Sequence, residues 1–151
     1  MKYFTLDLWI SNQSLDEDHN VVPVAEEYAR HLDAIRGRLP PELVRMLETL
    51  TLHDSRLREL SVNLGQRHVA ITFNAADNTG EKAVDVRLHY GGVDQVTSTA
   101  DPLRGLAGPH GYGDLGYDEL DVADNKLEHR LLFSTGIELT IRFEEFRFEL
   151  L

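Results

Sequence analysis

The sequence contains no cysteine among its 151 residues. Disulfide bonds, cysteine-ligated zinc sites and thiol nucleophiles are therefore excluded. A chain of this length buries enough of its surface to fold without a crosslink or a structural metal. We expect one domain that spans residues 1–151, with a helical part at about 20–50 and a β part at about 55–150.

Long hydrophobic runs are missing as well. No segment reaches the roughly 18 consecutive apolar residues that a membrane-spanning helix needs. The first ten residues hold Asp7 inside their apolar stretch and lack the basic leader and cleavage site of a signal peptide. The sequence therefore predicts a cytoplasmic protein that does not enter a membrane.

Positive charge is scarce. Only 15 basic residues face 26 acidic ones, which gives a formal net charge of −11. Such a field repels phosphate backbones and anionic lipids, so nucleic acid and membrane surfaces are excluded as partners. A basic protein is the partner that this charge favours, although a merely solubilising surface is the simpler interpretation.

Hydrophobic residues in the first third recur at helical spacing. Apolar positions separated by three or four residues predict one helix that ends before Pro40, and Pro41 suits the first turn of a second, short helix. Residues 2–10 fit either a strand or a short helix capped by Thr5.

From the middle of the chain onward, apolar and polar residues alternate instead. This period of two predicts strands or short strand segments at 60–64, 69–73, 84–90, 95–99, 120–122, 127–133, 137–143 and 146–150. Helices followed by strands are typical of an α+β fold. We expect two N-terminal helices packed on one face of an antiparallel sheet of five to seven strands.

Residues 101–116 interrupt the strand pattern with five glycines and two prolines, which predicts a flexible loop. Its end, Gly111–Gly116, matches the G-x-G-x-x-G pattern of dinucleotide-binding proteins. That site needs a helix directly after the glycines, whereas residues 117–122 alternate like a strand. No nucleotide and no other cofactor is therefore predicted.

Histidine and aspartate side chains suggest a weak metal site. His53 and Asp54 are adjacent, as in one class of metal-dependent phosphohydrolases, and His129 shares a strand face with Leu131 and so points inward. His89 falls on the outward face of its own strand. A small metal-dependent hydrolase that uses His53 and Asp54, with His129 as a further ligand, is our alternative hypothesis.

An acid-rich stretch lies between residues 114 and 124. The simplest interpretation is a solvated strand and turn, and the functional one is a docking surface for a basic partner. The candidate partner-binding residues are Asp114, Tyr117, Asp118, Glu119 and Asp121.

Several short motifs resemble those of a group of uncharacterised bacterial proteins. They are MKYFT at residues 1–5, LHDS at 52–55, YDEL at 117–120 and EHRLLFS at 128–134. The resemblance implies a bacterial cytoplasmic protein and no known activity. Small acidic α+β proteins are also found among the immunity proteins that neutralise bacterial toxins, although a shared fold type does not fix function.

No catalytic constellation emerges from these motifs. Our leading hypothesis is therefore a non-catalytic, acidic protein-binding module, immunity-like or regulatory, rather than an enzyme.

Overall fold

The computed structural model describes residues 1–12, 21–100 and 111–151. These parts contain three α-helices and eight β-strands. The helices are α1 (Leu6–Asn12), α2 (Val21–Ile35) and α3 (Pro41–Thr49), with a short 3₁₀ helix at Arg36–Arg38. The strands are β1 (Leu50–Asn63), β2 (His68–Asp77), β3 (Ala83–Gly91), β4 (Gln95–Ser98), β5 (Leu115–Ala123), β6 (Lys126–Phe133), β7 (Glu138–Phe143) and β8 (Glu145–Leu150).

The helices begin and end where local chemistry favours it. Pro41 occupies the first turn of α3, as expected, and Pro40 precedes it as the cap residue. The sequence of residues 2–10 fits either a strand or a short helix. In the structure, residues 6–10 belong to the helix α1. The hydroxyl of Thr5 accepts a hydrogen bond of 3.3 Å from the backbone N–H of Leu8 and so caps that helix.

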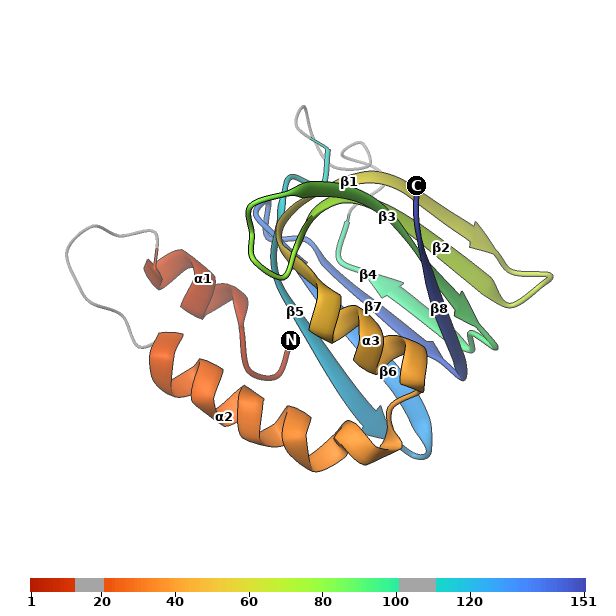
Figure 1. The fold of residues 1–151 in the computed structure, drawn as a ribbon, viewed down its shortest axis with the longest axis horizontal. Coiled ribbons are helices and arrows are strands. Elements are labelled where there is room, and N and C mark those ends of the chain that lie inside the picture. The colour runs from red at the N-terminus through yellow and green to blue at the C-terminus, as the bar shows by residue number, and fades with distance from the viewer. Residues whose placement is uncertain (13–20, 101–110) are drawn as a thin grey trace.

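The strands form two antiparallel sheets of four, in the orders β1-β2-β3-β8 and β4-β7-β6-β5 (Figure 1). The α+β class, with helices preceding antiparallel strands, is confirmed. The expected single sheet is in fact two, because the C-terminal strand β8 pairs with β3 in the first sheet instead of extending the second. Most other pairs join neighbours in the chain, which a period of two can predict.

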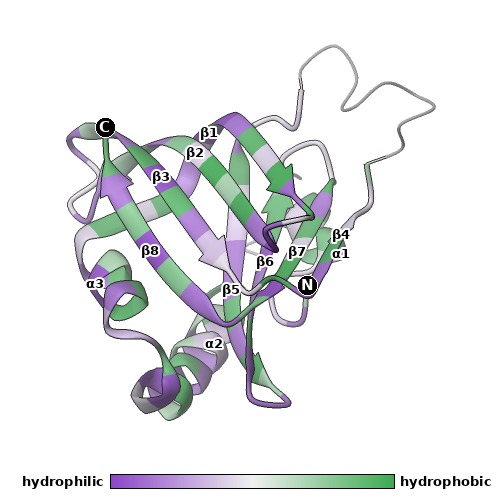
Figure 2. Ribbon diagram, turned by 90° about the vertical axis from the view of Figure 1, so that its right-hand side faces the viewer, coloured by the Kyte–Doolittle hydropathy of each residue, from purple (hydrophilic) through white to green (hydrophobic). Residues whose placement is uncertain are grey.

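One hydrophobic core joins both sheets. Hydrophobic and polar residues alternate along the strands, as the banding in Figure 2 shows. Ile71 and Leu88 from the first sheet and Leu131 and Ile141 from the second are fully buried in it. The edge strands β1 and β5 lie side by side, and Arg56 forms an isolated bridge with Asp114.

The helices do not share one face of one sheet. α1 and α2 lie beside β5, whereas α3 contacts β8 and β1 and buries Leu43 and Met46 (Figure 1). None of the helices in the described ranges has the length and apolar character that a membrane crossing requires. Because α1 and α2 lie beside β5, the N-terminal part of the chain covers this strand.

Candidate functional site

Strand β5 separates the acid-rich stretch into two faces. Asp118 points toward the core of the molecule, where it meets His129 of the neighbouring strand β6. Glu119 and Asp121 point the other way, toward the N-terminal segment and α2. The acids that appear as one patch in the sequence therefore have different partners in the fold.

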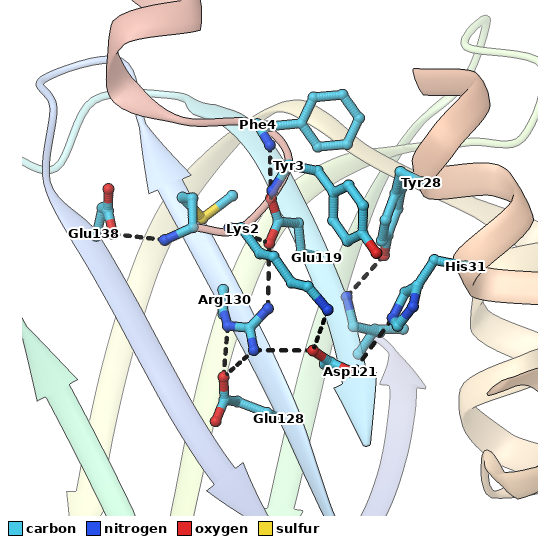
Figure 3. A network of polar contacts seen from close by, with 12 residues as sticks. Lys2, Tyr3, Phe4, Tyr28, His31, Glu119, Asp121, Glu128, Arg130 and Glu138 are labelled. Atoms are coloured by element: carbon cyan, nitrogen blue, oxygen red, sulfur yellow. Dashed lines mark hydrogen bonds and ion pairs between the residues drawn. The ribbon is translucent and has the colours of Figure 1, made fainter. Parts of the chain in front are cut away.

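Glu119 is completely buried. Its carboxylate accepts hydrogen bonds from the backbone N–H groups of Lys2, Tyr3 and Phe4 at 2.7–2.8 Å (Figure 3). The guanidinium of Arg130 lies 3.3 Å from the same carboxylate and balances its charge. Glu119 therefore fastens the N-terminal segment onto β5, and it is not available to a partner.

Asp121 belongs to the same polar network. It forms ion pairs with Arg130 at 3.1 Å and with Lys2 at 3.7 Å, and His31 of α2 lies 3.3 Å away (Figure 3). Burial opposes ionisation of this carboxyl, but the N–H of Val122 and the Arg130 guanidinium outweigh it and lower the pKa of Asp121. Neighbouring groups of the same chain thus stabilise the ionised form of Asp121.

Asp118 begins a hydrogen-bonded chain that runs into the core. Its Oδ2 atom lies 3.0 Å from Nε2 of His129, and Nδ1 of His129 lies 2.8 Å from the hydroxyl of Tyr90. His129 and Tyr90 are both fully buried, as the inward direction predicted for His129 requires. The Asp118 side chain is 22% exposed. This chain fixes the orientation of one partly exposed carboxylate.

An aromatic pocket of about 320 Å³ opens next to that carboxylate. The rings of Phe4 and Tyr117 stack at 4.6 Å between centroids, and His53 stacks on Tyr117 at 5.7 Å. Tyr28 accepts a hydrogen bond from the N–H of Leu120, and burial and the nearby Asp118 raise the pKa of its phenol. The pocket is lined by Phe4, Val21, Ala25, Tyr28, His53, Gly116, Tyr117 and Asp118.

His53 and Asp54 lie within β1. Nδ1 of His53 lies 2.5 Å from the carbonyl oxygen of Gly116, and Nε2 lies 3.6 Å from Asp54. Both nitrogens of His129 are engaged by Tyr90 and Asp118.

Within residues 1–12, 21–100 and 111–151, no three His, Asp or Glu side chains form a group that could hold a metal. The expected trio of His53, Asp54 and His129 is therefore not assembled as a ligand set.

The glycine motif at residues 111–116 leads into a strand, as expected, because β5 begins at Leu115. Most of the expected loop, residues 101–110, lies outside the described residues. Asp114 stays half exposed, and its nearest charged partner is Arg56 at 3.6 Å. It belongs to the β1–β5 junction and does not line the aromatic pocket.

Sequence reasoning identified Tyr117 and Asp118 but missed Phe4 and Tyr28 as parts of the same site. Four aromatic rings from distant segments, those of Phe4, Tyr28, His53 and Tyr117, converge here only through the tertiary fold, so no local spacing signals them.

No family model matches this chain, and no curated protein matches it at a significant level.

Proposed function

We propose that this protein binds a basic protein partner by accepting one lysine side chain of that partner in the aromatic pocket, against the carboxylate of Asp118. The observation that supports the proposal is the position of Asp118, which is 22% exposed beside four aromatic rings and is oriented by a buried histidine. Its partner would be a regulated or neutralised protein in the bacterial cytoplasm.

The pocket chemistry fits a cation. Aromatic faces attract an ammonium or guanidinium group with about 0.5–2 kcal/mol, depending on how far water is excluded. The carboxylate of Asp118 adds a charge-assisted hydrogen bond. The net charge of −11 steers a basic protein toward this surface before contact is made.

The free oxygen of Asp118 favours lysine over arginine. Oδ2 of Asp118 is engaged by Nε2 of His129, whereas Oδ1 has no hydrogen-bond partner among the described residues. An arginine fork matches two carboxylate oxygens, whereas an ammonium is satisfied by a single acceptor. We therefore expect lysine to be the residue that enters.

The same geometry argues against catalysis by the Asp118–His129–Tyr90 chain. A general acid or base must reach the proton it transfers, directly or through one water. His129 has 0% exposure, and Tyr90 and Asp118 occupy both of its ring nitrogens. His129 and Tyr90 position Asp118 and, because both are fully buried, do not themselves touch a bound molecule.

Trp9 gives a direct way to test the proposal. It is the only tryptophan of the chain, and its ring meets Tyr117 edge-on at 5.5 Å. We expect a short lysine-rich peptide to change the tryptophan fluorescence in a saturable, salt-sensitive way. Asp118→Asn keeps an oxygen that accepts from His129 but removes the charge, and it should weaken binding about tenfold or more.

The matched control is Asp85→Asn on β3, whose carboxylate bonds Asn74 in the other sheet. This variant should bind the lysine peptide like the parent protein. Equal affinity of the parent and Asp118→Asn, or tighter binding of an arginine-rich peptide, would contradict the proposal. Charge reversal of Glu119 is unsuitable as a test, because it would detach the N-terminal segment that carries Phe4.

A further inference from the structure

A second cluster of histidines lies on the outer face of the first sheet, away from the aromatic pocket. His68 begins β2 and His89 lies in β3, and both alternate with inward residues that are buried. In the antiparallel register His89 faces Ala70, one of the smallest side chains. The two histidines are therefore diagonal neighbours with room to lean toward each other.

Their rings meet through single nitrogen atoms. Nδ1 of His89 lies 3.3 Å from Nε2 of His68, with ring centroids 5.4 Å apart. Two histidine nitrogens bound to one tetrahedral zinc ion, each at about 2.0–2.1 Å, are separated by about 3.3 Å. The spacing matches a pair of ligands that share one ion.

The other nitrogen of His89 has the partner that metal-binding histidines usually have. Nε2 of His89 lies 3.0 Å from Oε1 of Glu149. A carboxylate on the far nitrogen fixes the tautomer and raises the basicity of the near one.

Open space and an additional carboxylate lie beside the pair. A depression of about 410 Å³ is lined by both histidines together with Gly91, Glu145, Phe146 and Arg147. A Cβ atom at Gly91 would come within 3.2 Å of the Glu145 carboxylate, so the glycine lets that side chain fold over the strand.

We propose that His68 and His89 bind one divalent transition-metal ion such as Zn²⁺, with water molecules in the remaining positions. The described residues offer no ready-made group of three ligands, so this is an open, two-histidine site. It is independent of the aromatic pocket and of the function proposed for it.

The test is a Zn²⁺ titration of the purified protein at pH 7.5 by competition with a chromogenic chelator. We expect one equivalent of zinc to bind, and His68→Gln and His89→Gln each to weaken binding at least about tenfold. Glu149→Gln should weaken it because the second nitrogen of His89 loses its carboxylate. Arg147→Gln should strengthen it by removing a repelling charge.

His53→Gln is the matched control, because it removes an exposed histidine outside the cluster. It should leave the affinity for zinc unchanged. In an NMR spectrum of the imidazole nitrogens, zinc should shift Nε2 of His68 and Nδ1 of His89. A protein that binds no zinc, or whose zinc affinity is the same in the His68 and His89 variants, would show that the pair is only a hydrogen bond between two rings.

Discussion

At the scale of single residues, Glu119 shows that an acid in an acid-rich segment can be a structural group. Its carboxylate has no exposure and accepts three backbone N–H groups. A buried carboxylate is tolerated only when its charge and its lone pairs are satisfied. Arg130 supplies the opposite charge, and the N-terminal segment supplies the donors.

Glu119→Gln should therefore destabilise the fold. The amide keeps the shape of the side chain but places an NH₂ group against N–H donors and removes the charge that Arg130 faces. We expect the free energy of unfolding to fall by about 2–3 kcal/mol, since hydrogen bonds to charged groups contribute more than neutral ones. Urea unfolding measures this difference.

Glu128→Gln is the control, because Glu128 also pairs with Arg130 but is partly exposed. We expect a loss of less than about 1 kcal/mol for this variant. Equal effects of the two substitutions would show that the hydrogen bonds to the N-terminal segment add nothing.

At the scale of elements, the contact of α1 with β5 depends on a glycine. A Cβ atom at Gly116 would lie 2.8 Å from Cζ3 of Trp9, and this rigid ring cannot yield without moving the helix. Gly116→Ala should shift the tryptophan emission and lower the free energy of unfolding by about 1–3 kcal/mol, as overpacking does.

Gly37→Ala is the matched control, because nothing lies within 4 Å of the Cβ atom it would add. We expect this variant to keep the emission maximum and the stability of the parent protein. A Gly116→Ala protein with unchanged emission and unchanged stability would contradict the contact between α1 and β5.

The elements also show how far the sequence alone could predict the fold. The hairpin of β6 and β7 and the break between the preceding helix and α3 at Pro40 follow from local signals, namely period-two alternation and the chemistry of proline. The pairing of β8 with β3 joins residues about 60 positions apart, from Gly91↔Glu145 to Val86↔Leu150. No local pattern specifies such a pair, so the division into two sheets was missed.

The site was predictable only in part for the same reason. Strand parity correctly placed His129 inward, because its neighbours in β6 show which face is apolar. It could not place Glu119, since β5 is buried on both faces, by the core on one side and by the N-terminal segment on the other. A strand covered on both faces has no polar side for parity to detect.

At the scale of the whole molecule, several carboxylates of this acidic chain are stabilised by hydrogen bonds and ion pairs with other groups of the same chain. Interactions with basic groups or hydroxyl and backbone donors lower the pKa of five carboxyls, those of Asp77, Asp94, Asp121, Glu144 and Glu149. Each of these groups is more acidic in the folded protein than in the unfolded chain. Their pairing therefore links stability to pH.

Whether stability rises or falls with pH depends on which state, folded or unfolded, binds protons first. As pH falls through the ordinary values of 3.8 for Asp and 4.5 for Glu, the unfolded chain takes up protons before the folded protein does. The stabilisation is complete above these values and is lost as pH falls toward the lowered folded values. We expect the urea midpoint to drop steeply below about pH 4.5.

One ion pair allows this acid dependence to be assigned. Arg142 donates to both carboxylate oxygens of Asp94, at 2.7 and 3.1 Å, and this contact is the main reason that the pKa of Asp94 is lowered. In Arg142→Gln the pKa of Asp94 should return toward its ordinary value, so the drop in the urea midpoint between pH 5 and pH 3 should become smaller. Arg58→Gln, at an arginine for which no ion pair is found among the described residues, should keep the full drop. If Arg142→Gln and the parent protein lost the same stability over this range, the acid sensitivity would have to come from carboxyls other than Asp94.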